Sequence, residues 1–397
     1  MVGGVIMQLK EHQRVAAEWI HNHGFQCMLC DDMGLGKTAT ALSGIAGWLD
    51  MGRYLVVCPA SLKLNWCYEI KTWLNIDTVP DNMTDYPIAV TNYERLGAHK
   101  DVIKEQNFIG VIFDESHYLK NPNSTRTKLA IELCRYIMFV MLLSGTPMLS
   151  GPADLASQLD VLRLLPDFGG YKKFYHRYCD PVKTSYGWDF TGASHIAELH
   201  KKLKKFMIRR TKKECGINLP PKQIIDVPIV ECTQPYASTL QDMELQQQEV
   251  NNIKYPYAID FISNLLQNGK RPVVFVHHKK LMKDLMNKYR DIAVNIYGGQ
   301  TAEERECSVR MFQNREVPLI FCSLQASATG ITLTSSDTAV FLEYLWSPSI
   351  SKQAQDRIHR ISQTKPVTIY NLYCPKSIES QKEIRSYVKE LDMEGVL

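Results

Sequence analysis

The sequence has no hydrophobic run long enough to cross a membrane. The longest apolar stretch among its 397 residues spans 136–143, whereas a membrane helix needs about 20 apolar residues. We expect this stretch to be a buried strand. The N-terminal MVGGVIMQLK lacks the apolar centre of a signal peptide, so we expect a soluble intracellular protein, cytoplasmic in a bacterium or a phage-infected host and nuclear in a eukaryote.

Patterned cysteines are also missing. Of the eleven, only Cys27 and Cys30 form a CxxC pair, and no second pair stands at zinc-binding spacing. Because free cysteine behaves as a small hydrophobe, we interpret both as buried strand residues, with metal or redox chemistry as the alternative. The net charge of +4 is small, so it permits nucleic-acid binding without arguing for it.

The chain has no low-complexity tract or short-period repeat, and strand and helix patterns fill it instead. Two series of short apolar segments alternate with helical stretches, which predicts an α/β protein of two lobes with parallel sheets. The first series is Cys27–Cys30, Tyr54–Cys58, Ile88–Val90, Val111–Phe113 and Met138–Leu143, and the second is Pro272–Val276, Val294–Tyr297, Leu319–Cys322, Thr338–Leu342 and Thr368–Tyr373.

A basic segment separates the two series. We expect a first lobe over 1–150, a mostly helical, basic insertion or linker over 151–220, and a second lobe over 221–397 that ends in a helix. Lys201–Lys213 carries eight Lys or Arg residues and is followed by the chain-breaking pair Pro220-Pro221. This basic run fits either a solvated helix face or a surface that faces DNA.

The first candidate site is CMLCDDMGLGKTATAL, which reads as a strand, a turn and the start of a helix. Gly34 and Gly36 lack a Cβ, so backbone amides can approach phosphate oxygens, and the following helix points its positive end at them. We expect Lys37 to reach the β- and γ-phosphates and the Thr38 hydroxyl to bind Mg²⁺. The generic phosphate loop has glycine where this chain has Asp31, so that pattern is not matched in full.

A second candidate site is the acidic pair Asp114-Glu115, which ends an apolar strand. At the carboxyl end of a parallel strand, these side chains face the ligand crevice. We expect Asp114 to hold the magnesium ion, directly or through water, and Glu115 to orient and deprotonate the attacking water. Acidic residues also end strands as solvated caps, but the upstream phosphate loop favours the catalytic interpretation.

Short polar side chains follow this pair. His117 lies two residues after Glu115, and LLSGTPM places Ser144 and Thr146 at the end of another strand. There, hydroxyl donors can sense changes at the magnesium site, although the segment alone is an ordinary turn.

A further candidate lies near the other end of the chain. QAQDRIHRISQ (353–363) reads as a helix, with Gln353, Arg357 and Arg360 near one face. Two arginines in a different lobe from the phosphate loop suit arginine fingers, which stabilise charge on a transferring phosphoryl group. A solvated basic face is the alternative.

Taken in their order along the chain, these motifs resemble those of helicase superfamily 2, and within it those of the Swi/Snf-type DNA translocases. The resemblance runs from about residue 8 to about residue 375. It is carried by LKEHQ (Leu9–Gln13), DDMGLGKT (Asp31–Thr38), LVVCPASLKLNW (Leu55–Trp66), VTNYE (Val90–Glu94), DESHYLKNPNSTRTK (Asp114–Lys128) and RIHRISQ (Arg357–Gln363). The segments FYHRYCD (Phe174–Asp180), VFVHHKK (Val274–Lys280) and LTSSDTAVFLEYLWSP (Leu333–Pro348) resemble its annealing-helicase and fork-remodelling (HARP-like) branch.

The resemblance implies two RecA-like (P-loop NTPase) lobes with helical insertions, ATP and Mg²⁺ bound between the lobes, and ATP hydrolysis coupled to movement on double-stranded or forked DNA. It nominates Gln13 as the adenine-reading residue, with Gly330 and Gln353 also at the nucleotide. DNA contacts should be mainly to phosphate, since a motor must tolerate any sequence. The candidates, each of which could be structural instead, are Lys63, Asn65, Thr91, Asn92, His277, His278, Lys279, Ser327, Thr329 and Trp346.

Two positions depart from the family pattern. Ser116 replaces the usual Ala of the DEAH box, and Ser362 replaces the usual Gly of motif VI, but the catalytic residues remain. We expect a minimal, monomeric motor without accessory domains.

Three functions stay open on the sequence alone. The leading one is a double-stranded DNA translocase that remodels or reanneals DNA. A strand-separating DNA or RNA helicase would need a wedge element, and none is identifiable in the second lobe. A nucleotide-gated DNA-binding module with weak hydrolysis is disfavoured by the intact Lys37, Glu115, Arg357 and Arg360.

Overall fold

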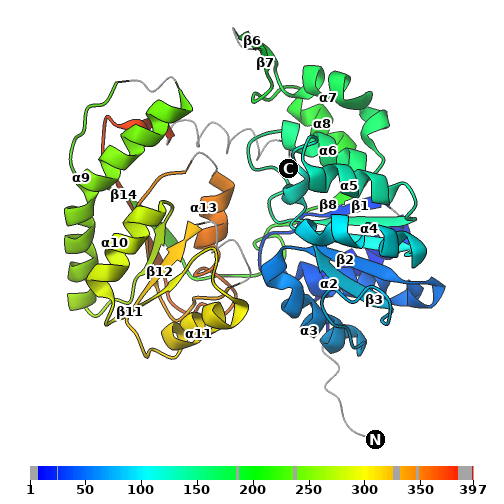
Figure 1. Ribbon diagram of the computed structural model, residues 1–397, viewed down its shortest axis with the longest axis horizontal. Coiled ribbons are helices and arrows are strands. Elements are labelled where there is room, and N and C mark those ends of the chain that lie inside the picture. The colour runs from blue at the N-terminus through cyan, green and yellow to red at the C-terminus, as the bar shows by residue number, and fades with distance from the viewer. Residues whose placement is uncertain are drawn as a thin grey trace, which may run out of the picture. The chain divides into compact units, whose positions relative to one another are not determined.

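The computed structural model describes residues 8–24, 26–184, 187–235, 239–324, 331–345, 348–382 and 396. Contacts within the chain divide it into two units, Met1–Gly216 with Leu391–Leu397, and Ile217–Glu390. Each unit has its own parallel sheet with helices on both faces (Figure 1). Residues 151–216, which the sequence suggests as part of an insertion, pack within the first unit.

The first unit is built on a six-stranded parallel sheet in the order β3-β2-β4-β5-β1-β8. Its strands are β1 (Gln26–Leu29), β2 (Tyr54–Cys58), β3 (Ile88–Asn92), β4 (Gly110–Asp114), β5 (Phe139–Leu143) and β8 (Met207–Ile208). Outside this sheet, β6 (Val182–Thr184) and β7 (Gly187–Asp189) form an antiparallel hairpin.

Strand alternation gives this sheet two apolar faces. Helices α1 (Glu11–His23), α2 (Lys37–Ile45) and α3 (Lys63–Leu74) bury side chains in the cluster on one face. Helices α4 (Leu96–Glu105), α5 (Thr125–Cys134), α6 (Ala153–Val161), α7 (Gly170–Tyr178) and α8 (Ile196–Leu203) do so on the other. Short 3₁₀ helices lie at Ala46–Met51, Ala60–Leu62, Tyr93–Arg95, Ser116–Leu119 and Leu165–Phe168.

The second unit repeats this plan, with a parallel sheet in the order β11-β12-β10-β13-β14-β9. Its strands are β9 (Lys222–Pro228), β10 (Val273–Val276), β11 (Ala293–Ile296), β12 (Leu319–Ser323), β13 (Thr338–Phe341) and β14 (Val367–Tyr373). Helices α9 (Leu240–Gln267) and α10 (Lys279–Tyr289) cover one face, and α11 (Ala302–Gln313) and α13 (Pro348–Gln355) cover the other.

The CxxC pair is part of the first core. Cys27 belongs to the apolar cluster on one face of the sheet and Cys30 to the cluster on the other, so the two thiols do not face each other. Burial raises the pKa of each thiol to about 12. The interpretation as buried residues is confirmed for both, with Cys27 in β1 and Cys30 directly after it, and all eleven cysteines are free.

The predicted α/β class with two parallel sheets is confirmed, and each of the ten predicted strands is found within two residues of its expected bounds. Of the buried strand predicted over 136–143, residues 139–143 form the buried β5, whereas Tyr136 and Met138 are exposed and precede it. Within the described ranges, no helix is both long and apolar enough to cross a membrane. Of the predicted C-terminal helix, residues 378–382 are helical, and most of the remainder lies outside the described residues.

The predicted helix over 353–363 is wrong in extent, because α13 ends at Gln355. The carbonyl of Arg357 accepts a hydrogen bond from the Leu333 amide at 2.8 Å. In a continuing helix, this carbonyl would instead accept from the amide four residues later in the chain. Arg357 and Arg360 therefore lie in turns that follow the helix.

Candidate active site

Three adjacent strands deliver the predicted catalytic segments to one edge of the first sheet. In the order β4-β5-β1, the phosphate loop follows β1, Asp114 ends β4, and Ser144 follows β5. Since the strands are parallel, their carboxyl ends share that edge, where ligands bind in open α/β sheets. A Cβ on Gly145 would lie 3.2 Å from the Lys37 Nζ, which places the β5 end directly against the phosphate loop.

The phosphate loop curls around the Lys37 ammonium. Gly36 is the N-cap of α2 in a left-handed conformation (φ 79°), and no described side chain caps this helix end. Lys37 Nζ donates to the Asp31 carbonyl at 2.8 Å. An uncapped helix start, a glycine turn and a central ammonium fit a nucleotide triphosphate, whose oxygens accept such hydrogen bonds. Thr38 lies in the first turn of this helix.

Gln13 is fixed against the same loop. Its Nε2 donates to the Leu35 carbonyl at 3.1 Å, and its Oε1 accepts from the Lys10 amide at 2.9 Å. A Cβ on Gly36 would lie 2.1 Å from this Nε2, so only glycine fits there. The proposed adenine-reading glutamine thus also braces the phosphate loop.

Asp31, the departure from the generic phosphate-loop pattern, has a structural role. Its buried carboxylate forms a two-pronged ion pair with Arg210, through Nε at 3.0 Å and through Nη2. Arg210 also donates to the His12 carbonyl, and its own carbonyl accepts from the Asp32 amide at 3.0 Å. This arginine therefore ties α1, the phosphate loop and the end of β8 together.

Breaking this ion pair should lower stability strongly. Asp31→Asn leaves the Arg210 guanidinium without its anion, and losing one partner of a buried pair costs roughly 3–5 kcal/mol. We expect a loss of about 3 kcal/mol in the free energy of unfolding, measured by urea denaturation. Glu11→Gln, which breaks an exposed pair with Arg14, is the control and should lower the free energy of unfolding far less, because exposed ion pairs contribute little to stability. Equal effects of the two substitutions would contradict the anchoring role.

Asp114 and Glu115 differ in environment. Trp66 Nε1 donates to Asp114 Oδ2 at 2.8 Å. Burial, with the neighbouring charge of Glu115, raises the pKa of Asp114 to about 6. Glu115 has a left-handed backbone (φ 51°), which turns its carboxylate toward His117, 3.2 Å away at Nδ1, and Ser144, 3.5 Å away at Oγ.

The predicted coupling residues lie together. His117 Nδ1 and Ser144 Oγ are 3.4 Å apart, and the Thr146 amide donates to Ser144 Oγ at 3.1 Å. A change at Glu115 can therefore reach the end of β5 through direct contacts.

A second link between these strand ends passes through Gln158, which sequence reasoning missed. Ser116, the departure from the DEAH box, donates to Gln158 Oε1 at 2.8 Å. The Gln158 Nε2 then donates to the Pro147 carbonyl at 2.7 Å. All three residues are buried, and the hydrogen bond to Gln158 offsets the desolvation cost of the hydroxyl that Ser116 adds.

The donor set fits a hard divalent cation. A threonine hydroxyl and a buried carboxylate are oxygen ligands of the kind that Mg²⁺ prefers, with waters and phosphate oxygens completing its shell. Among the described residues, no group of three or more His, Cys, Asp or Glu could hold a metal. The site fits magnesium bound with a nucleotide better than a protein-only metal cage.

The second unit contains the predicted arginines. Arg360 Nη1 donates to Thr332 Oγ1 at 2.7 Å, and burial lowers the pKa of Arg360. Arg357 and Gln353 are both buried, Gln353 on α13. Ser362 Oγ lies 3.0 Å from Thr334 Oγ1. Gly330 lies outside the described residues.

Two predicted DNA-contacting residues of the first unit meet at Asp81, which sequence reasoning missed. Lys63 Nζ pairs with Asp81 Oδ2 at 2.5 Å, and Thr91 Oγ1 donates to Oδ1 at 2.8 Å. Arg95 and His99 approach the same carboxylate at 2.9 and 3.7 Å. Although burial opposes it, these partners hold the pKa of Asp81 below its usual range. We call Lys63, Asp81, Thr91, Arg95 and His99 the Asp81 cluster.

Two other candidates of this unit lie near the cluster in sequence. Asn65 is exposed on α3, and the buried Asn92 donates through Nδ2 to Glu94 at 2.6 Å. The Asp81 cluster, as defined above, therefore does not include either side chain.

In the second unit, Glu343 organises the end of β10. Its Oε2 accepts from the amides of His277 and His278 at 2.5 and 3.0 Å, and its Oε1 pairs with the His278 ring. Burial raises the pKa of Glu343, but these donors dominate and lower it to about 2. His278 lines a polar cavity of about 360 Å³ between α9 and α10.

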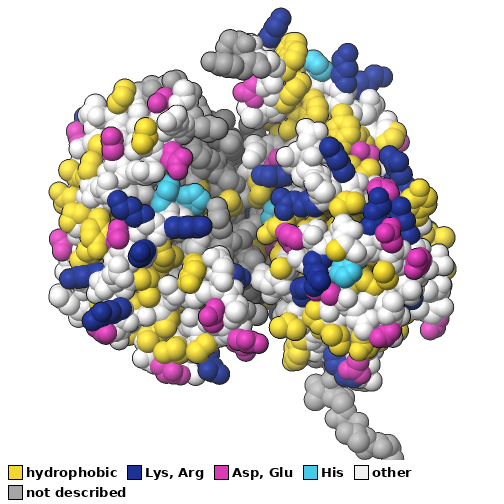
Figure 2. Space-filling model, in the orientation of Figure 1, with side chains coloured by type: hydrophobic (Ala, Val, Ile, Leu, Met, Phe, Trp, Pro, Cys, Tyr) yellow, Lys and Arg dark blue, Asp and Glu magenta, His cyan; other side chains and the backbone are white. Residues whose placement is uncertain are grey.

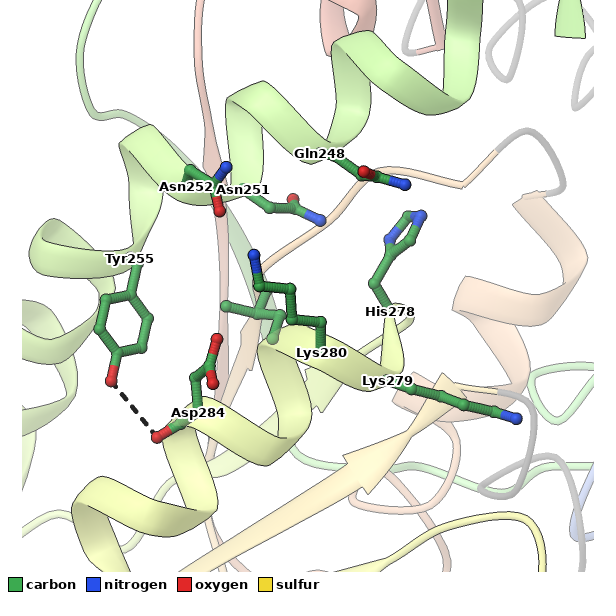
Figure 3. A pocket seen from close by; sticks show the side chains of 9 residues that line it. Gln248, Asn251, Asn252, Tyr255, His278, Lys279, Lys280 and Asp284 are labelled. Atoms are coloured by element: carbon green, nitrogen blue, oxygen red, sulfur yellow. Dashed lines mark hydrogen bonds between the residues drawn. The ribbon is translucent and has the colours of Figure 1, made fainter. Parts of the chain in front are cut away.

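Figure 3 shows how the side chains of His278, Lys279 and Lys280 lie around this cavity. His278 and Lys280 point toward the polar side chains of α9, whereas Lys279 points away from them. Lys279 is exposed whereas His277 and His278 are half-buried, so Lys279 is the best placed of these three predicted residues for a phosphate contact. Ser327, Thr329 and Trp346 lie outside the described residues.

Comparison with known proteins gives the family. A sequence model of the SNF2-related domain matches residues 12–254, and one of the helicase conserved C-terminal domain matches residues 256–362. The chain is 32% identical to the SWI/SNF-related matrix-associated actin-dependent regulator of chromatin subfamily A-like protein 1 of Xenopus laevis, over 93% of this chain and 42% of that protein. It is 30% identical to DNA annealing helicase and endonuclease ZRANB3 of Homo sapiens, over 95% of this chain and 38% of that protein.

The chain thus spans less than half the length of these relatives. Its fold is similar to a solved structure, the Sulfolobus solfataricus SWI2/SNF2 ATPase core in complex with dsDNA, with a TM-score of 0.50, 22% identity, and coverage of 98% of this chain and 96% of that one. The two parallel sheets are therefore those of two RecA-like lobes. Because the SNF2-related match alone covers more than half of the 397 residues, this protein belongs to the SNF2-related family.

Proposed function

We propose that this protein hydrolyses ATP and uses the energy to move along double-stranded DNA. The observation that carries the proposal is the meeting of the phosphate loop, Asp114-Glu115 and Ser144 at one sheet edge, in a chain of the SNF2-related family. The name of the human relative, a DNA annealing helicase, supports DNA as the track and reannealing as the result. Such a motor would work where ATP and DNA are present, in a nucleus or in bacterial or phage-infected cytoplasm.

The chain's own residues divide the hydrolytic work. Glu115 accepts a proton from water as the water oxygen bonds to the γ-phosphorus of ATP. The bond from this phosphorus to the β–γ bridging oxygen breaks, which gives ADP and inorganic phosphate. Lys37 and the amides at the start of α2 stabilise the charge on the phosphate oxygens. Mg²⁺, held by Thr38 and Asp114, would neutralise further phosphate charge.

The remaining residues would couple this step to movement. Arg357 and Arg360 are proposed to add positive charge at the γ-phosphate from the second lobe, with Gln353 and Gly330 at the nucleotide. Loss of the γ-phosphate would free the Glu115 carboxylate, and His117 and Ser144, which contact it, would pass that change to the end of β5.

One assay separates the three open functions. ATP turnover is measured with blunt duplex DNA, forked DNA, single-stranded DNA and RNA at equal nucleotide concentration. We expect duplex and forked DNA to stimulate turnover by at least about tenfold. Stimulation by RNA alone would overturn the proposal in favour of an RNA helicase, and turnover that no nucleic acid stimulates would favour a binding module.

The Asp81 cluster yields a prediction for DNA binding. Asp81 orients Lys63, Thr91 and Arg95, and a charge-assisted hydrogen bond is worth about 1.5–3 kcal/mol. We expect Asp81→Asn to raise the duplex concentration for half-maximal ATPase stimulation by about tenfold, equal to ~1.4 kcal/mol, while turnover at saturating DNA changes less than about twofold.

The direction of the change in DNA affinity distinguishes an effect of net charge from the loss of side-chain positioning by Asp81. Asp81→Asn removes a negative charge, so an effect of net charge alone would tighten DNA binding, and that result would contradict a positioning role. Asp81→Glu should restore part of the affinity. Asp77→Asn, which breaks an exposed pair with Lys71, is the matched control and should leave DNA stimulation unchanged.

A further inference from the structure

The β6–β7 hairpin is a surface that the proposed motor cycle does not use. Its strands lie outside both parallel sheets, and their residues are all exposed. Figure 1 shows the hairpin projecting beyond α7 and α8 of the first unit. Trp188, in β7, is 53% exposed, so this short two-stranded ribbon presents part of an indole ring to solvent.

The Trp188 ring is held in place despite its exposure. The His176 ring meets the Trp188 ring edge-on, with 5.5 Å between the ring centroids. The Phe190 ring is stacked with the Trp188 ring, with 6.5 Å between the centroids. The ring centroids of Phe190 and Tyr175 are 5.1 Å apart, and both side chains pack against the apolar core of the first unit. A chain of aromatic contacts thus runs from the core to an exposed indole, which loses little conformational freedom when a flat ligand stacks on it.

The face that carries Trp188 is basic. Lys183 is the direct cross-strand partner of Trp188, and such partners share one face of an antiparallel ribbon. Asp189 pairs with Val182 and so lies on the opposite face. On α7, Lys172 is exposed one helical turn before His176. Figure 2 shows Lys or Arg, His and hydrophobic side chains side by side in this region.

We propose that this hairpin binds single-stranded DNA, with one unpaired base stacked on the free face of Trp188 and the adjoining phosphate paired with Lys183. An aromatic ring beside a cation suits an unpaired strand, since bases inside a duplex already have both faces covered. The inference rests on the proposed action on DNA and deepens it: the substrate includes an unpaired segment next to the duplex, as at a fork or bubble.

The test measures binding of a fluorescent oligothymidine and a blunt duplex of equal length by anisotropy, for the wild type, Trp188→Ala and Trp188→Phe. Stacking on an aromatic ring is worth about 5- to 150-fold in affinity per base, so we expect Trp188→Ala to bind oligothymidine about tenfold more weakly. Duplex affinity should change less than about twofold, and Trp188→Phe should keep most of the single-strand affinity.

A matched control separates stacking from a general effect of surface aromatics. Tyr136 is 74% exposed and also lies beside a lysine, with Lys104 Nζ at 6.0 Å from its ring. Tyr136→Ala should bind both DNAs as the wild type does. Unchanged oligothymidine binding in Trp188→Ala, or equal losses for both DNAs, would overturn the hairpin assignment.

The same variants keep the two proposals distinguishable. If the wild type is stimulated by duplex DNA but Trp188→Ala loses the extra stimulation by forked DNA, the hairpin assignment is supported. If stimulation by forked DNA stays at the wild-type level in Trp188→Ala, the assignment falls and the motor function stands. A wild type that no DNA stimulates would remove the proposed function itself, and oligothymidine binding then judges the hairpin alone.

Discussion

Replacing Glu115 with glutamine is expected to lower DNA-stimulated ATP turnover by about 10³-fold, within the roughly 10²–10⁴-fold range of general base catalysis. The amide keeps the size of the side chain and its place beside His117 and Ser144, but it cannot accept the proton of the attacking water. ATP binding should change little, because the contacts of the loop around Lys37 remain. Steady-state turnover and titration calorimetry with Mg-ATP measure the two quantities.

Glu132→Gln is a control for the loss of a carboxylate in the same unit. Glu132 pairs with Lys100 and Lys104 on the surface, away from the three strand ends that form the site. Its turnover should match the wild type. Undiminished turnover in Glu115→Gln would remove Glu115 as the residue that deprotonates water.

Replacing Arg360 with alanine is expected to lower turnover by about 10³-fold while ATP affinity changes only a few-fold. An arginine finger is worth roughly 10³–10⁵ in rate because its charge meets the developing charge of the transferring phosphoryl group. Although burial lowers the pKa of Arg360, a guanidinium stays protonated at neutral pH, so the charge is available. Arg360→Lys should recover little, since an ammonium lacks the planar fork.

Arg290→Ala tests whether any arginine of the second unit would have this effect. Arg290 is exposed and lies beside Asp291, so its loss should leave turnover unchanged. If Arg360→Ala also turns over at the wild-type rate, Arg360 is a structural residue that holds the Thr332 segment rather than a finger.

Ten strands of the two sheets could be predicted from the sequence because their signals are local, but β8 and β9 could not. Tyr54–Cys58 and Leu319–Ser323, for example, are apolar runs that are almost wholly buried in the structure. β8 could not be read, because its two apolar residues, Met207 and Ile208, lie in a run rich in Lys and Arg. Its strand conformation comes from pairing with β1, about 180 residues earlier in the chain.

The residues of the candidate site also divide into those that local sequence patterns predict and those that only the fold brings together. Lys37 and the Asp114-Glu115 pair belong to short motifs, whose spacing is visible in the sequence. Asp31–Arg210, Ser116–Gln158 and His278–Glu343 join residues far apart in the chain, 179 positions in the first case. No spacing rule signals such contacts, so the residues that hold the motifs in place emerge only from the fold.

The most direct test of the central claim is displacement of a third strand from duplex DNA. A motor that moves along double-stranded DNA expels a triplex-forming oligonucleotide from its path without separating the duplex beneath it. We predict ATP-dependent release by the wild type, and release by Glu115→Gln that is no faster than without protein. Stimulated ATP hydrolysis by the wild type with no release of the third strand would contradict movement along duplex DNA.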